Sequence, residues 1–352
     1  MLTKEQISEI KKHLEKAQNP LFFFDNDPDG LCSFLLLSRY LNEIKGGVKG
    51  VAVKSFPELD ESYFRKVHEL KADYIFVLDK PVISNEFFKL VEQNNIPIVW
   101  IDHHELSPNF SVPGFVHYYN PLFNEIPSNE PTTRLCYQIN DNKRDLWIAI
   151  VGCISDSFYP DFYQDFLKEY PDLCINSKDA FEIFYKSNIG KIAKIFSFAL
   201  KDRTTNIISM IKFLKEVKTP YEVLEETKKN YTMHARFKQI SQRYRKLIEK
   251  AKAVSYSGKL IFFQYGGDLS ISSDLSNELI YLYPNKIVVV VYVSGIKANI
   301  SIRGKNVKPI VLKAIEGLDD SSGGGHENAV GAKIKLEDIE KFREKILKLI
   351  SD

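Results

Sequence analysis

Short apolar segments alternate with helical patterns along the first third of the chain, and this alternation limits the possible folds more than any other feature. The apolar segments, which have the length of strands, are residues 21–24, 48–56, 73–79 and 96–102, and the helical patterns are 33–44, 61–71 and 84–95. Strands that alternate with helices of about 10–15 residues indicate βαβ units and a mostly parallel sheet. We therefore expect an α/β domain over residues 1–160.

The rest of the chain is organised differently. Residues 161–253 are helical and charged, without strand alternation, and we interpret them as a helical connector. Strand signals return at 259–265 and 286–304, with helical patterns around them, which predicts a smaller α/β domain over 254–352. The length of 352 residues fits this division into two domains and a connector.

Composition excludes several classes of protein. The chain has 48 Lys and Arg against 46 Asp and Glu, a formal net charge of +2, which excludes a histone-like protein and an acidic disordered tail but allows a local basic groove. No apolar run reaches the roughly 18 residues of a membrane span, and the N-terminus has no signal-peptide core. The four cysteines form no CxxC pair, so we expect reduced core cysteines in a cytoplasmic protein.

Acidic residues and histidines follow the strands and one helix of the first domain. They are Asp25, Asp27 and Asp29 after the first strand, Asp79 at the end of a later one, Asp102 with His103 and His104 at the end of another, and Asp156 at the end of an apolar helix. Parallel strands deliver their carboxyl ends to one edge of the sheet, where ligands bind in such folds. We expect these side chains to meet there.

Each of these features has an ordinary explanation when it is taken alone. Asp-Pro-Asp-Gly is common turn chemistry, an Asp after a strand often caps a helix, and paired histidines occur on surfaces. Together, however, so many acids would be costly to bury, and few lysines or arginines lie near them in the sequence. A metal cluster removes that cost, and oxygen ligands with one or two imidazoles favour Mn²⁺ or Mg²⁺ over structural Zn²⁺.

The ordered set of motifs resembles the DHH phosphoesterase superfamily. DNDPDG at 25–30, Asp79, the Asp102-His103-His104 run and Asp156 are similar to its four motifs. GGGH at 323–326, followed by ENAVGAKI, resembles the glycine-rich motif of the DHH-associated C-terminal domain, and Ser301 and Arg303 fit its preceding strand. The resemblance extends from about residue 20 to 336 and leaves the helical middle unassigned.

The resemblance implies two domains facing each other across an active-site cleft, with two Mn²⁺ or Mg²⁺ ions. Carried over by motif, the metal ligands would be Asp27, Asp29, Asp79, His103 and Asp156, with Asp79 bridging the ions, and Asp102 would complete the catalytic set. His104 is better placed to contact the scissile phosphate than to bind metal. Successive glycines allow backbone N–H groups to approach a phosphate. The expected substrate-binding residues are therefore Ser301, Arg303, Gly323, Gly324, Gly325 and His326.

One position departs from the family pattern. Many members have a histidine four residues before the first Asp of the DxD pair, and this chain has Phe23 there. Either Asp25 takes part of the lost ligand role, or the first metal is weakly held. The Asp-x-Asp-x-Asp-Gly run resembles the RecJ branch and disfavours an inorganic pyrophosphatase.

We therefore expect a compact, archaeal-type RecJ-like exonuclease that hydrolyses single-stranded DNA or RNA by a two-metal mechanism. Basic residues interleaved with aromatics in 229–253 fit a nucleic-acid strand, although such a stretch is also typical of a solvated helix face. Expected partners are single strands or short oligonucleotides and replication or repair proteins, with self-association through the helical middle. The alternatives are an oligoribonuclease that also cleaves phosphoadenosine phosphate, and a non-catalytic Cdc45-like replication scaffold.

Overall fold

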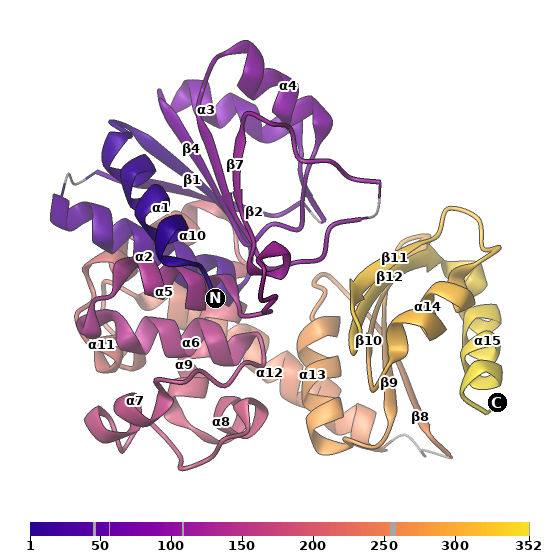
Figure 1. The fold of residues 1–352 in the computed structure, drawn as a ribbon. Coiled ribbons are helices and arrows are strands. Elements are labelled where there is room, and N and C mark those ends of the chain that lie inside the picture. Colours follow the sequence, from indigo (N-terminus) through magenta and orange to yellow (C-terminus); the bar gives the residue numbers. More distant parts are fainter. Residues whose placement is uncertain (45–46, 56, 108, 254–257, 352) are drawn as a thin grey trace. The chain divides into compact units, whose positions relative to one another are not determined.

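The computed structural model describes residues 1–44, 47–55, 57–107, 109–253 and 258–351, and it divides into two compact units, Met1–Phe237 and Lys238–Asp352 (Figure 1). Each unit has its own sheet and core. The three-part division at residues 160 and 253 stays a prediction, and Phe56, the last residue of one predicted strand, lies outside the described residues.

The first unit is built on a parallel sheet, as the alternation predicts. Its strands are β1 (Pro20–Asp25), β2 (Lys49–Val53), β4 (Tyr74–Leu78), β6 (Ile98–Ile101) and β7 (Val116–Tyr119), in the spatial order β2-β1-β4-β6-β7. All four pairings are parallel. After β1, the chain adds β2 on one side of β1, and then adds β4, β6 and β7 on the other side. The strand order therefore switches direction between β1 and β4. Open α/β sheets bind ligands at such a switch point.

Helices cover both faces of this sheet (Figure 1). On one face, Phe22 and Phe24 of β1 pack in a core with α1 (Lys4–Lys16), α2 (Pro28–Ile44), α5 (Thr132–Asn140), α6 (Leu146–Ser155) and α9 (Asn188–Leu200). On the other face, Phe23 packs with α3 (Arg65–Glu69) and α4 (Asn85–Gln93). The alternation of neighbouring residues between two cores follows from the two-residue period of a strand. Three layers result, with every central strand buried.

The other helices before residue 254 extend the first core or lead to the second unit. They are α7 (Tyr163–Glu169), α8 (Ala180–Lys186), α10 (Thr204–Glu216), α11 (Pro220–Leu224) and α12 (Tyr231–Ala253), which runs across the division between the units, and a two-strand pair is formed by β3 (Glu58–Leu59) and β5 (Val82–Ile83). None of the helices in the described ranges combines the length and apolar character needed to span a bilayer.

The second unit is the predicted smaller α/β domain. Its sheet has the order β11-β12-β10-β9-β8, built from β8 (Leu260–Gly266), β9 (Ile287–Ser294), β10 (Lys297–Arg303), β11 (Ser322–His326) and β12 (Ala329–Lys335). Its helices are α13 (Ser272–Leu282), α14 (Val307–Ile315) and α15 (Ile339–Ser351). The four cysteines are all free thiols, and Cys174 alone is not fully buried.

Candidate metal centre

The acidic segment after β1 forms the first turn of α2 rather than a separate turn. Oδ1 of Asp27 accepts a hydrogen bond from the Gly30 N–H at 2.9 Å, so this carboxylate caps a helix that begins at Pro28 rather than at residue 33. Proline suits a first helical position because no N–H is needed there. A Cβ at residue 30 would lie 2.5 Å from the carbonyl oxygen of Asp25, so the close approach requires glycine.

Asp29 joins α2 to the start of α5. Its Oδ1 accepts a hydrogen bond from the Thr133 N–H at 2.7 Å, and its Oδ2 accepts one from the Thr132 N–H at 2.9 Å. The first turn of any helix leaves such N–H groups without helical partners, and the residue before α5, Pro131, has no side-chain cap to offer. The buried Asp29 carboxylate therefore caps α5 from a distant part of the sequence.

Asp79 follows β4 in a left-handed backbone conformation, with φ of 58°. Asp tolerates this region better than most residues, and such backbone positions gather at functional sites. Its side chain is buried, and Oδ1 accepts a hydrogen bond from the Thr132 hydroxyl at 3.2 Å. Burial raises the pKa of Asp79 well above its ordinary value, and the charges of Asp29 and Asp27 raise it further.

His103 faces three carboxylates through a single ring nitrogen. Its Nε2 lies 3.4 Å from Asp79, 3.8 Å from Asp156 and 3.9 Å from Asp29. On the other side of the ring, Nδ1 lies 3.1 Å from Oδ1 of Asn129. An amide oxygen only accepts hydrogen bonds, so this contact favours a proton on Nδ1 and leaves Nε2 as the nitrogen that faces the carboxylates. A metal-binding histidine typically donates its other ring N–H to such an acceptor.

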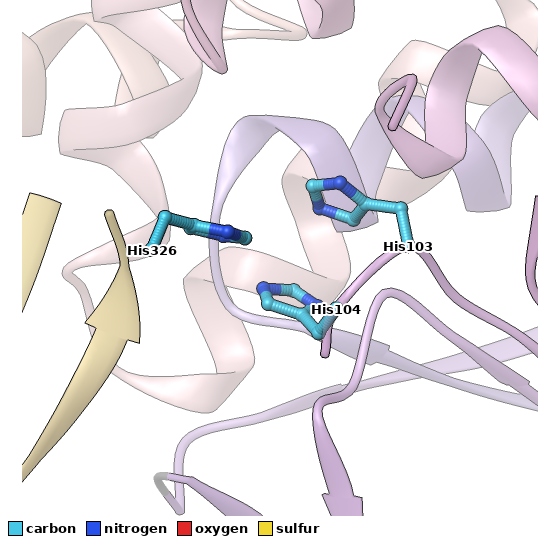
Figure 2. A group of neighbouring side chains, drawn as sticks. All are labelled: His103, His104 and His326. Atoms are coloured by element: carbon cyan, nitrogen blue, oxygen red, sulfur yellow. The ribbon is translucent and has the colours of Figure 1, made fainter. Parts of the chain in front are cut away.

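His104 is held by its neighbour Asp102 instead of joining His103. Oδ1 of Asp102 lies 2.8 Å from Nδ1 of His104, and Oδ2 accepts the His104 N–H at 3.1 Å. The two imidazole rings lie side by side, with centroids 4.4 Å apart (Figure 2). Burial lowers the pKa of His104, but the charge and hydrogen bond of Asp102 outweigh it and raise the pKa to about 9. This favours the cationic form of His104 at neutral pH in the metal-free protein.

Asp25 is engaged by a lysine that the sequence analysis did not take into account. Nζ of Lys80 lies 3.0 Å from Oδ1 of Asp25 and also donates to the carbonyl oxygen of Ser55 at 2.7 Å. The Lys80 side chain is fully buried. The sequence analysis expected few cations near these acids, and Lys80, which follows Asp79 directly in the sequence, is one that pairs with them.

Phe23 belongs to the core and not to the acidic edge. It is fully buried and packs edge-on against Phe87, with ring centroids 5.7 Å apart, and against Tyr63. Asp25, two residues after Phe23, is instead the acid nearest to this position along the chain, and it pairs with Lys80.

Two groups of side chains in the first unit are close enough to hold an ion. The potential ligand atoms of Asp29, His103 and Asp156 lie within 4.8 Å of one another, and so do those of Asp79, Asp102 and His104. Burial, followed by the charges of Asp25 and Asp29, raises the pKa of Asp27 to about 7, so the cluster resists full ionisation by itself. A bound cation removes this resistance. Oxygen donors with an imidazole fit Mn²⁺ or Mg²⁺.

The substrate-binding residues predicted in the second unit lie on two strands. On β10, Ser301 exchanges a hydrogen bond with Ser272 at 2.9 Å, and Nε of Arg303 donates to Oδ1 of Asn277 at 2.6 Å. The glycines 323–325 do not form a loop. They are part of β11, the edge strand that His326 ends (Figure 2), and they pair with β12.

Two of the aromatic residues that interleave the basic stretch of α12 serve packing. Phe237 packs against the first core, with its ring 6.0 Å from that of Phe198, and Tyr244 is buried with its hydroxyl bonded to Glu278. Tyr231 remains exposed. The ordinary interpretation of a helix face fits this part of the chain better than a platform for bases.

Sequence reasoning did not identify Asn129, Thr132, Thr133 or Lys80 as parts of this site. None of them belongs to a local motif, because each contacts a residue that is remote in the sequence. The adjacency of Lys80 to Asp79 was the one signal available.

Two family models match the chain. The DHH family N-terminal domain matches residues 21–149, and the DHHA1 domain matches residues 254–352, so together they cover more than half of the chain. A search of curated proteins found no match.

Several solved structures share the fold. RecJ from Thermus thermophilus in complex with Mn²⁺ matches with a TM-score of 0.66 and 15% identity, over 97% of this chain and 53% of that one. An exonuclease RecJ bound to manganese matches with a TM-score of 0.65 and 14% identity, over 97% and 92%. CDC45 from Entamoeba histolytica matches with a TM-score of 0.55 and 9% identity, over 99% of each chain. This chain thus spans about half the length of the Thermus RecJ.

Proposed function

Because the chain belongs to the DHH phosphoesterase superfamily and has a RecJ-like fold, we propose that it is a metal-dependent exonuclease that hydrolyses single-stranded DNA or RNA from an end. Members of this superfamily are phosphoesterases. The choice of a nucleic-acid strand as substrate rests on the RecJ-like motifs and on the basic surface described below.

The observation that carries the proposal is the orientation of His103. Its Nε2 faces the carboxylates of Asp29, Asp79 and Asp156, while Nδ1 contacts Asn129. We assign Asp27, Asp29, Asp79, His103 and Asp156 as the residues that would hold two Mn²⁺ or Mg²⁺ ions, with Asp25 at their margin. When bound, such ions polarise a phosphodiester and lower the pKa of a water nucleophile.

His104 and Asp102 supply a different function. The imidazolium of His104, fixed at Nδ1 by Asp102, presents Nε2–H to a phosphate oxygen that gains negative charge as the bond breaks. A positioned cation of this kind stabilises charge that develops in the transition state. It can also give its proton to the leaving oxygen, which makes Asp102 the residue that sets its tautomer and its charge.

The second unit would hold the substrate beyond the bond that is cleaved. Arg303 can donate hydrogen bonds to a phosphate, and edge strand β11 can offer an anion those backbone N–H groups of Gly323, Gly324 and Gly325 that do not pair with β12, because no Cβ intervenes. Ser301 and His326 add a hydroxyl and an imidazole. We propose these residues as the substrate-binding set.

The test is digestion of single-stranded DNA and RNA, labelled at the 5′ or the 3′ end, in the presence of Mn²⁺. We expect release of mononucleotides from one end of strands of twenty or so nucleotides, and loss of about 10³-fold or more of the rate in His103→Ala and Asp79→Asn. Asp165→Asn, an exposed carboxylate paired with Lys168, is the matched control and should keep full activity.

A length series separates the proposal from its alternatives. Much faster cleavage of dinucleotides and phosphoadenosine phosphate than of long strands would make the protein an oligoribonuclease. An absence of Mn²⁺-dependent hydrolysis, with strand binding intact in His103→Ala, would instead favour a non-catalytic scaffold.

A further inference from the structure

A groove of about 980 Å³ lies along the outer side of β2 in the first unit, and none of the residues assigned above lines it. Consecutive residues of β2 line the groove on one side. Successive side chains of a strand point to opposite faces of the sheet, so a groove lined only by side chains would include every second residue. The backbone edge of β2 therefore borders the groove. The apolar side chains Ile207, Ile208 and Ile211 of α10 line the other side, and Tyr63 lies near the end of β2.

The lining is strongly basic. It contains Lys49, Lys54, Arg65, Lys66, Lys212 and Lys215 but one acid, Glu216. Lys66 is neutralised by an ion pair with Glu69. The remaining five cations leave a local excess of positive charge in a chain whose net charge is only +2. A concave surface with charge of one sign concentrates ligands of the opposite sign.

Three of these ammonium groups are held in place without being neutralised. Nζ of Lys49 donates to the carbonyl oxygen of Leu70 at 2.9 Å, Nζ of Lys54 to that of Asp202 at 2.6 Å, and Nζ of Lys215 to that of Val48 at 2.7 Å. A carbonyl orients an ammonium group but leaves its full charge, and an ammonium has three donors. The groove is therefore a fixed set of cations with donors to spare.

Two further cations stand at the rim. Arg65 and Lys212 are exposed, and no hydrogen bond or ion pair joins either of them to another residue in the described ranges. Lysines on an edge strand often serve only to prevent edge-to-edge pairing of sheets. That explanation accounts for Lys49 and Lys54, but not for the cations that α3 and α10 contribute.

The groove begins next to the acidic edge of the sheet. Lys54 directly follows β2, and the next residue, Ser55, accepts a hydrogen bond from Lys80 at 2.7 Å. Lys80 in turn pairs with Asp25 at the candidate metal centre. A long anion that follows the groove toward the carboxyl end of β2 thus arrives beside the acidic cluster.

The backbone of β2 argues against an added peptide strand. At one end, the carbonyl oxygen of Val48 is occupied by Lys215, and at the other the Lys54 N–H donates to the Tyr63 hydroxyl at 2.8 Å. A peptide that extends a sheet depends on a row of main-chain hydrogen bonds, and both ends of this row are already in use. Phosphate contacts need no such row and depend on cations alone.

We propose that the groove between β2 and α10 binds the sugar-phosphate backbone of a single nucleic-acid strand, independently of base sequence, as a secondary contact outside the metal centre. This inference rests on the proposed function, since it extends the substrate path of that site. In a strand too long to be held by the metal centre alone, the groove binds the phosphates that lie outside that centre.

The experiment measures binding without catalysis. Fluorescein-labelled dT₂₀ is titrated with protein in EDTA over a range of salt concentrations, and the double variant Arg65→Glu/Lys212→Glu is compared with Lys178→Glu/Lys191→Glu. The control pair has the same change in charge at exposed positions of the first unit that do not line the groove. Because all four side chains are exposed, both variants should fold, which circular dichroism checks.

We expect the groove variant to bind dT₂₀ about tenfold more weakly at low salt and with a salt slope smaller by about 1.4, the value for two lost phosphate contacts on a single strand. The control variant should change the affinity for dT₂₀ and its salt dependence much less. Mn²⁺-dependent cleavage of a labelled dinucleotide, which is too short to span both sites, should be unchanged in the groove variant.

Different failures have different meanings. Equal weakening in both variants would overturn the groove and leave the exonuclease proposal standing. Displacement of dT₂₀ by poly-glutamate at equal charge in the wild type but not in the groove variant would reassign the groove to acidic peptides. Absence of both strand binding and hydrolysis in the wild type would overturn the proposed function and the groove together.

Discussion

Nζ of Lys80 lies 3.0 Å from Oδ1 of Asp25, and the lysine side chain is completely buried. Because this ammonium group is buried, water cannot solvate its charge, and the carboxylate must compensate that charge instead. The ion pair therefore compensates part of the acidic cluster before any metal binds.

Replacement of Lys80 by methionine should destabilise the metal-free protein by about 3 kcal/mol, because the partner carboxylate then stays in a buried acidic cluster without its cation. Urea unfolding in EDTA measures this change. Lys89→Met removes an exposed pair with Glu86, 4.0 Å apart, and should change stability by less than about 0.5 kcal/mol.

The double variant Asp25→Asn/Lys80→Met provides a second check. It removes both charges and should recover much of the lost stability, since no buried charge then lacks a partner. If Lys80→Met alone is as stable as the wild type, the ion pair has no role in holding the cluster.

The contact between Asn129 and His103 makes a prediction about metal affinity. Asn129→Ala removes the partner of Nδ1, so the ring is no longer held with Nε2 toward the carboxylates. Loss of such an outer partner typically weakens metal binding by about 10–100-fold. Calorimetric titration with Mn²⁺ should show at least the lower value, while the exposed Asn176→Ala should bind as the wild type does. An unchanged affinity in Asn129→Ala would contradict the assignment of His103 as a ligand.

The parallel sheet and the position of the acidic edge were predictable because both follow from local patterns. Apolar segments that alternate with amphipathic ones specify the strands, and the end of each strand specifies where Asp25, Asp79 and Asp102 emerge. Some strands were missed, among them the four-residue β7 and the seven-residue β12, and the glycines of β11 were interpreted as residues whose N–H groups approach a phosphate. Glycine runs carry no strand signal, so only the pairing with β12 makes them a strand.

The contacts that organise the site were not predictable in the same way. Asp29 caps α5 through Thr132 and Thr133, which lie about a hundred residues further along the chain. No local rule connects residues at that separation, because the contact exists only once α2 and α5 pack together. The same holds for Asn129 and His103, whereas Lys80 could have been noticed next to Asp79.

The pKa of Asp27 predicts how stability depends on pH. Its value of about 7 in the folded protein exceeds the value of about 3.9 expected for an unfolded chain, so the folded state holds a proton that the unfolded state releases. In EDTA, this group should lower stability as pH rises from about 4 to about 7, by at most about 1.4 kcal/mol per pH unit.

Thermal unfolding from pH 4 to 8 measures this effect as the difference in melting temperature between the wild type and Asp27→Asn. The variant has no titratable group at this position. The difference should be absent for Asp165→Asn, which is exposed. With saturating Mn²⁺ the trend should reverse, because the ion binds the ionised form and competes with the proton. A wild-type profile in EDTA that matches Asp27→Asn would show that Asp27 is ionised throughout.

The pair formed by Asp102 and His104 predicts a histidine that titrates unusually late. In the metal-free protein, the ring nitrogens of His104 should titrate with a pKa of about 9, and their contribution to stability should be complete below about 6.5 and lost as pH rises through 9. Asp102→Asn removes the charge that opposes burial, so the pKa should fall to 6.5 or below. Nitrogen-15 spectra of the histidine rings measure both values directly. His68, an exposed histidine of α3, is an internal reference that Asp102→Asn should leave unmoved. A His104 that titrates near 6.5 in the wild type would remove its assignment as the cation that contacts the phosphate.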